Sequence, residues 1–163
     1  MDVVDAIRGK RAVRRFEDRP LPDDVLESIL DAGRRAQSSK NTQPWTFVVV
    51  RDRATLRALS ACGHYAGHLA GAATGVALVT SEAWAFDIGQ AAAYLQLAAA
   101  GLGVGSCIAS MWEEDRAKEL LGVPADPHLE VAISFGYPAP EEAERPPRRG
   151  RRPLDDVVRW EHW

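Results

Sequence analysis

Residues 84–102 read WAFDIGQAAAYLQLAAAGL and form the longest apolar stretch of the chain, around which the other elements must be arranged. Their length and composition predict a helix that is apolar on nearly every side, which is typical of a helix covered by its neighbours. Asp87, Gln90 and Gln96 interrupt the stretch and make it a poor membrane span. We therefore expect a central buried helix, and a second subunit is one candidate for part of its cover.

The sequence on either side of this helix predicts helices and strands that alternate along the chain. We expect further helices at residues 2–10, 22–33, 53–62 and 113–121, and strands at residues 46–50, 76–80, 104–109 and 129–135. This order is typical of an α+β or α/β sandwich with one sheet. One domain is expected at residues 1–140, followed at residues 141–163 by an extended linker and a tail rich in Val and Trp.

Composition limits the classes of protein that this chain can belong to. Its 163 residues are 46% apolar and 26% charged, the proportions of a globular domain with a single core. A net charge of −3 argues against a general nucleic-acid binder. Cys62 and Cys107 form neither a disulfide framework nor a metal-binding spacing. Because no secretory signal is evident, a cytoplasmic protein without a membrane partner is expected.

Two motifs that suggest chemistry have simpler structural explanations. The glycine run GLGVGS at residues 101–106 follows a helix and enters a strand, whereas a dinucleotide fingerprint lies between a strand and the next helix. We interpret it as a helix stop. His64 and His68 are four residues apart, but no third ligand with metal spacing is near, so a surface or loop position is expected for both.

Two basic clusters and one polar segment are more informative. The clusters are KRAVRRF at residues 10–16 and RRGRR at residues 148–152, and the polar segment SSKNTQPW occupies residues 38–45. Guanidinium groups bind phosphate in a two-pronged fashion, so both clusters can close around one phosphate. Amides and hydroxyls can recognise the polar edge of a heterocycle. Together they indicate a nucleotide-like cofactor, although a solvated run of charge is the alternative explanation of the first cluster.

At these residues the sequence resembles the FMN-dependent nitroreductase family. RAVRRF at residues 11–16 is similar to the family's Arg-Ser-x-Arg-x-Phe opening, and residues 38–45 resemble its more specific Ser-Ser-x-Asn-x-Gln-Pro-Trp signature. Further matches are DIG at 87–89, GLG at 101–103, LLGVP at 120–124, GYP at 136–138 and RRPL at 151–154. The resemblance implies an α+β three-layer sandwich, with a mainly antiparallel sheet of four to five strands between helices. It also implies a homodimer with the long helix at its interface and residues 141–163 packed on the partner.

The resemblance assigns cofactor-binding roles by position and implies no catalytic side chain and no metal. The phosphate is assigned to Lys10, Arg11, Arg149 and Arg151, and the pyrimidine end of the flavin to Arg14. The ring or ribityl chain is assigned to Ser38, Ser39, Asn41 and Gln43, with the other subunit as one source of these four. The flavin face and its N5 edge are assigned to Ile108, Ala109 and Ser110.

The function that this resemblance implies is FMN-dependent oxidoreduction. NADH or NADPH would donate a hydride to flavin N5 and leave, and an electron-poor acceptor such as a nitroaromatic or a quinone would then be reduced. The flavin supplies this chemistry, so no acid–base triad is required. Relatives with dehalogenation, flavin-fragmentation or dehydrogenation activity are alternatives. A non-catalytic FMN-storage protein is another, because Ala12 replaces a serine whose lost hydrogen bond would cost about 1 kcal/mol.

Overall fold

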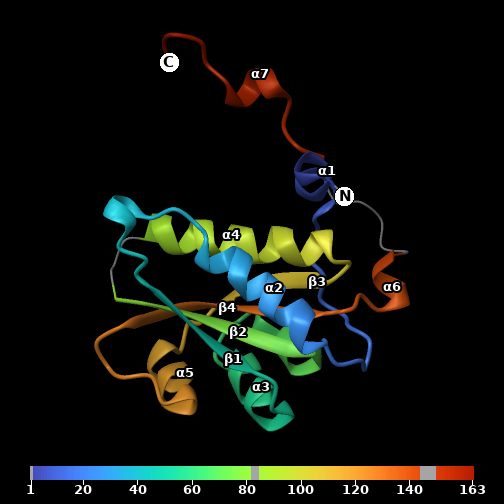
Figure 1. Ribbon diagram of the computed structural model, residues 1–163, viewed down its shortest axis with the longest axis vertical. Coiled ribbons are helices and arrows are strands. Elements are labelled where there is room, and N and C mark those ends of the chain that lie inside the picture. The colour runs from blue at the N-terminus through green and yellow to red at the C-terminus, as the bar shows by residue number, and fades with distance from the viewer. Residues whose placement is uncertain (1, 82–84, 144–149) are drawn as a thin grey trace.

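The described residues form a single sheet with helices packed on both of its faces (Figure 1). The structure is a computed structural model that describes residues 2–81, 85–143 and 150–163. Its strands are β1 (Trp45–Val50), β2 (Thr74–Thr80), β3 (Gly105–Ser110) and β4 (His128–Gly136). They lie in the order β1-β2-β4-β3, and every pairing is antiparallel. The predicted α+β fold with a central antiparallel sheet is confirmed.

Helices flank the sheet on both faces, and further short helices lie outside these layers. The helices are α1 (Val3–Gly9), α2 (Asp23–Arg34), η1 (Ser39–Asn41), α3 (Arg53–Ser60), η2 (Ala66–Gly71), α4 (Ala85–Gly101), α5 (Glu114–Leu121), α6 (Pro140–Ala143) and α7 (Leu154–Val157). α2 and α4 cover one face of the sheet, and α3, η2 and α5 cover the other (Figure 1). The ends of the predicted elements differ from the observed ends by at most two residues, and residue 84 lies outside the described residues.

The central strand β2 is buried along its whole length because helices cover both of its faces. Val76 and Leu78 belong to the core beneath α4, whereas Ala77 and Val79 belong to the core on the side of α3 and η2. This alternation follows from the two-residue period of side chains in a strand. The sheet therefore separates two apolar cores.

α4 is fixed above the sheet by its close approach to α2. A Cβ at Gly33 would collide with the side chain of Leu95, so a larger residue would require Leu95 or the helices to shift. Leu95 and Ala99 are fully buried on this side of α4. This packing determines where α4 places its two buried polar residues, Asp87 and Gln96.

The joint between α4 and β3 is a helix stop, as predicted. α4 ends at Gly101, Gly103 has a φ of 73°, and β3 begins at Gly105. That positive φ is a conformation that glycine adopts readily and other residues do not. The glycine run therefore links a helix to a strand and does not form a dinucleotide fingerprint.

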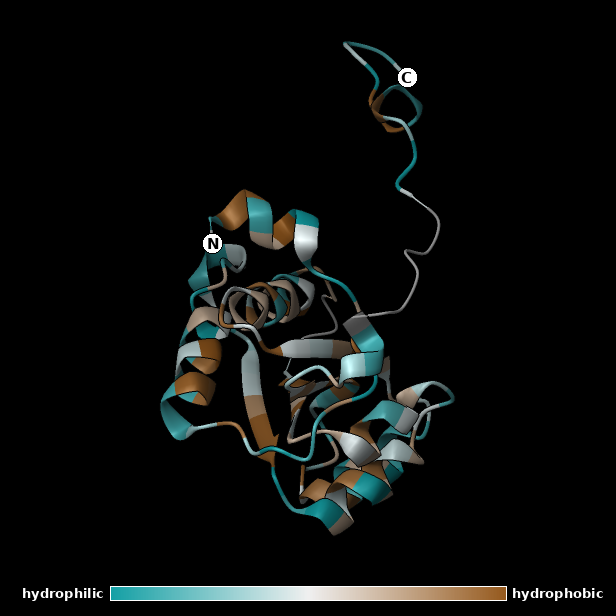
Figure 2. Ribbon diagram, turned by 90° about the vertical axis from the view of Figure 1, so that its right-hand side faces the viewer, coloured by the Kyte–Doolittle hydropathy of each residue, from teal (hydrophilic) through white to brown (hydrophobic). Residues whose placement is uncertain are grey.

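Several elements expose apolar side chains that a single chain leaves uncovered. Val3 and Ile7 of α1 are 66% and 58% exposed, and Trp160 after α7 is 81% exposed. Figure 2 shows hydrophobic residues on α1 and α7, with α7 standing clear of the body. Phe86 of α4 is 64% exposed, so one chain does not cover this helix on every side. Exposed apolar surface of this kind is typical of a face that binds another molecule.

Candidate functional site

The basic segment at residues 10–16 follows the outer edge of β3, an edge strand of the sheet. Ala12 forms a parallel bridge with Ser106, and the Val13 N–H donates to the Ser106 carbonyl at 2.9 Å. A Cβ at Gly105 would lie 2.8 Å from the Cβ of Val13, so the close approach requires glycine. The backbone of the basic segment is therefore fixed against the sheet.

The same segment is also held by α6. One oxygen of the buried Glu142 carboxylate accepts the Arg14 N–H at 2.9 Å and the Arg15 N–H at 3.0 Å. The Ala139 N–H donates to the Arg15 carbonyl at 3.0 Å. Hydrogen bonds to a carboxylate are stronger than neutral ones. They fix the backbone of Arg14, and the side chains of Arg11 and Arg14 stay exposed.

Lys10, at the end of α1, is half-buried and meets α4. Its Nζ donates to Gln96 Oε1 at 3.2 Å. Burial lowers the pKa of Lys10 because it penalises the charged form; Cys107 raises this pKa, and the charge of Arg151 lowers it. Lys10 and Arg151 therefore lie within electrostatic reach of each other, which favours an anionic ligand. Arg149, assigned to the same phosphate, lies outside the described residues.

The polar loop at residues 38–43 has an unusual backbone. Lys40, Asn41 and Gln43 have φ angles of 51°, 57° and 50°. These lie in the left-handed region, which residues other than glycine and asparagine seldom adopt. The Ser38 Oγ accepts the Gln43 N–H at 2.9 Å and closes the loop. The loop exposes the side chains of Ser39, Asn41 and Gln43.

This loop and the basic segment contact different ends of α4 (Figure 1). The Ser39 N–H donates to Asp87 Oδ2 at 2.8 Å in the first turn of the helix, whereas Lys10 contacts Gln96. Asp87 and Gln96 are nine residues apart, which is about 13 Å along a helix. Within one chain, the two groups of predicted cofactor residues are therefore not brought together.

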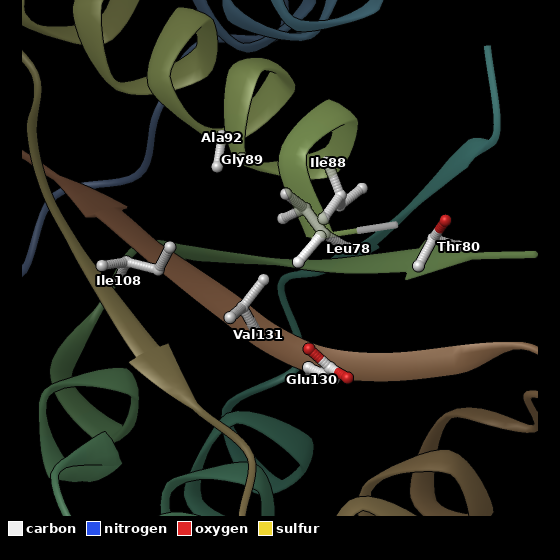
Figure 3. Close-up of a pocket in the computed structure, with 9 residues that line it drawn as sticks. Leu78, Thr80, Ile88, Gly89, Ala92, Ile108, Glu130 and Val131 are labelled. Atoms are coloured by element: carbon white, nitrogen blue, oxygen red, sulfur yellow. The ribbon is translucent and has the colours of Figure 1, made fainter. Parts of the chain in front are cut away.

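A small apolar pocket lies between α4 and the sheet (Figure 3). Its volume is about 130 Å³, and its walls include Leu78, Ile88, Ala92, Ile108 and Val131. Pockets that enclose small ligands usually measure roughly 300–1,000 Å³. One chain alone therefore does not enclose a flavin ring here. Ile108, at 43% exposure, is the predicted flavin-face residue that lines this pocket.

The outer edge of β3 is covered at two points and open between them. The basic segment covers it at Ser106, and Gly63 lies directly against the carbonyl of Ser110. Because the Ser106 carbonyl points outward, strand alternation also directs the backbone groups of Ile108 and Ser110 to this edge. Ala109 turns its side chain into the opposite core, and by the same alternation its backbone groups face Ala132 of β4.

His68 is buried, so the surface or loop position expected for it is wrong. Its Nδ1 lies 2.7 Å from Ser134 Oγ, and Ser134 donates in turn to the Cys107 carbonyl at 3.3 Å. Burial lowers the pKa of His68 to about 4, with a smaller contribution from the charge of Arg14. The ring therefore belongs to the core behind β4, whereas His64 is exposed as expected.

Sequence reasoning gave no cofactor role to three residues that hold the candidate site together, Asp87, Gln96 and Glu142. Asp87 and Gln96 were both marked as polar residues in an otherwise apolar helix, and Asp87 also belongs to the DIG motif matched at residues 87–89. Glu142 carried none, since its partners lie 127 and 128 residues earlier in the chain.

The residues that the structure describes lack both a metal-binding cluster and a membrane-spanning helix. They contain no group of three or more His, Cys, Asp or Glu side chains arranged to hold a metal ion. Their helices include none with the length and hydropathy needed to cross a bilayer.

Comparisons with known proteins agree on one family. The model of the Nitroreductase family matches residues 7–74 and 65–137. An Archaeoglobus fulgidus protein, provisionally named NADH dehydrogenase/NAD(P)H nitroreductase, is 33% identical over 148 residues, 83% of this chain and 85% of that protein. The NADH dehydrogenase of Thermus thermophilus is 28% identical over 98% of this chain and 96% of its own length. The solved structure of an FMN-dependent nitroreductase from Clostridium difficile has a TM-score of 0.86 and 26% identity, and covers 98% of this chain and 99% of that one.

Proposed function

The chain belongs to the nitroreductase family, and on that premise we propose that it is an FMN-dependent oxidoreductase. It takes electrons from NADH or NADPH and reduces an electron-poor acceptor such as a nitroaromatic or a quinone. The names of the three relatives described above support this class of reaction. A homodimer in the cytoplasm is part of the proposal.

The environment of Lys10 is the observation that carries the proposal. Its ammonium is half-buried within electrostatic reach of Arg151, and its hydrogen bond goes to the neutral amide of Gln96. A phosphate placed against these cations would offset the cost of burying the ammonium and raise the pKa of Lys10 again. Arg11 belongs to the same segment, and Arg149 joins this set on the family resemblance alone. The residues present therefore fit the phosphate end of FMN.

The ring end of the cofactor would be shared between two subunits. Because residues 38–43 lie about 13 Å along α4 from Lys10, a two-fold axis that pairs the open faces of α4 would bring the loop of one subunit to the basic segment of the other. Phe86 and Tyr94, 64% and 42% exposed, belong to that face, and the tail with Trp160 would pack on the partner. The loop residues in contact with the ring or ribityl chain would be Ser38, Ser39, Asn41 and Gln43, opposite Ile108, Ala109 and Ser110.

The work of this chain would be binding and orientation. Hydride acceptance at N5 and delivery to the acceptor, in ping-pong order, are the chemistry that FMN supplies when bound. Arg14, on a backbone fixed by Glu142, would hold a positive charge at the pyrimidine end of the ring, where it favours negative charge. Ile108 and the apolar pocket beside it would exclude water from one side of the ring.

The colour of the purified protein tests this proposal directly. The protein should be yellow, release FMN on denaturation, lose its colour when NADH or NADPH is added without oxygen, and regain it when a nitroaromatic or quinone follows. Colourless protein that also fails to bind added FMN would overturn the proposal. Yellow protein that neither nicotinamide reduces would favour the storage alternative that Ala12 leaves open.

A further inference from the structure

The loop at residues 38–43 holds a backbone shape that its own sequence does not favour. Lys40 and Gln43 have left-handed φ angles although neither is glycine or asparagine. Such conformations persist where the surrounding structure fixes them, and they are frequent at ligand-binding sites. The contacts that hold this loop are therefore the contacts that determine where its side chains lie.

Some of these contacts join the loop only to itself. The Ser38 Oγ accepts the Gln43 N–H at 2.9 Å, and the Thr42 N–H donates to the Ser39 carbonyl at 3.0 Å. Such bonds can preserve the turn, but they do not place it relative to the rest of the fold. At its end, the loop is joined to the sheet through the Ser81 N–H, which donates to the Pro44 carbonyl at 3.2 Å.

Asp87 supplies the link between the tip of the loop and α4. Asp87 is 2% exposed, and its Oδ2 accepts the Ser39 N–H at 2.8 Å. A carboxylate in the first turn of a helix is favoured by the exposed N–H groups there. A buried carboxylate is costly unless it is hydrogen-bonded, so this contact is strongly preferred over an unbonded arrangement. The long helix and the loop are thereby locked in one relative position.

We propose that Asp87 is the positioning residue that holds residues 38–43 in the conformation required to bind the cofactor. Asp87 does not itself contact the ligand; it acts through the Ser39 backbone. Its effect reaches the exposed side chains of Asn41 and Gln43, which follow Ser39 in the same turn. This inference rests on the proposed function, because that function supplies the ligand of the loop.

The test compares Asp87→Ala, which removes the acceptor, with Asp87→Asn, which keeps an oxygen that can accept the Ser39 N–H. The matched control is Glu114→Ala in α5, which removes another carboxylate that accepts a backbone N–H, from Leu129, also at 2.8 Å. FMN titrations of the flavin-free proteins measure affinity. Amide hydrogen exchange of residues 39–43 measures loop order without any ligand, and the visible circular dichroism of saturated protein measures the ring environment.

Asp87→Ala should weaken FMN binding at least about tenfold, speed exchange in the loop and change the flavin spectrum. Asp87→Asn should recover most of the affinity and the wild-type spectrum, and Glu114→Ala should lower stability alone. Unchanged affinity and spectrum in Asp87→Ala, or an equal loss in Asp87→Asn, would overturn this inference while leaving the proposed function intact. Wild-type protein that binds no FMN would instead overturn the proposed function and the positioning role with it.

Discussion

Replacing Lys10 with methionine would remove the ammonium and keep most of the apolar stem that packs beside α4. A hydrogen bond to a charged group contributes about 1.5–3 kcal/mol, so FMN should bind roughly 10- to 150-fold more weakly. The flavin-free protein should become slightly more stable. Burial lowers the pKa of Lys10 in the folded state, so at neutral pH the folded protein bears the full cost of the charged form. That gain should shrink as the pH rises toward 10.5 and Lys10 itself loses its proton.

Riboflavin makes the assay specific, because it has the ring and ribityl chain of FMN without the phosphate. Fluorescence titrations of flavin-free wild type and Lys10→Met should show weaker binding of FMN and nearly equal binding of riboflavin. The control is Arg57→Met, which removes an exposed positive charge from α3 on the other face of the sheet. An equal loss for both flavins, or the same loss in the control, would refute the assignment of Lys10 to the phosphate.

Four other predictions test the remaining parts of the site and the fold. Arg14→Ala should weaken FMN binding or slow flavin reduction without changing urea unfolding, since its side chain is exposed; unchanged affinity and rate would contradict its placement at the ring. Gly105→Ala should lower the free energy of unfolding by about 1–3 kcal/mol, measured with urea, because its Cβ would lie 2.8 Å from Val13; a neutral result would mean that the basic segment is not held against the sheet. The pKa of His68 falls from 6.5 to about 4 on folding, so stability is complete above pH 6.5 and decreases as the pH falls toward 4. Urea titrations should show a loss of about 2 kcal/mol between pH 7 and pH 5 in the wild type, and His68→Gln should lack this component. Subunit exchange between Arg14→Ala and Asn41→Ala dimers should restore FMN binding in about a quarter of the sites, since each hybrid has one intact site, and no recovery would argue against a shared site.

The positions of helices and strands were predictable because neighbouring residues determine them. The β-branched run that ends at Val50 predicts a strand wherever it lies in the fold. Gly122, with a φ of 65°, ends α5 at the residue where the pattern places a stop. The long helix was predictable from its composition. Its exposed face with Phe86 was not, because tertiary packing determines which side of such an apolar helix lies on the sheet.

The contacts of the candidate site were not predictable, because they join residues that are distant in the chain. Nothing near His68 indicates that it meets Ser134, 66 residues later, and becomes part of the core. The hydrogen bond from the Arg14 N–H to Glu142 spans 128 residues. The separation of the polar loop from the basic segment depends on which turn of α4 each one contacts, and a motif match contains no such information.

The short opening along β3 also has a consequence for solubility. Bare strand edges recruit strands from other molecules, and this is a common route to fibrils. Here Ala12 occupies the edge at Ser106 and Gly63 blocks it at Ser110, so only about one residue between them is accessible. An incoming strand needs several consecutive backbone groups to pair with. The gap is therefore too short to seed such growth, yet it still leaves the Ile108 backbone within reach of a small molecule.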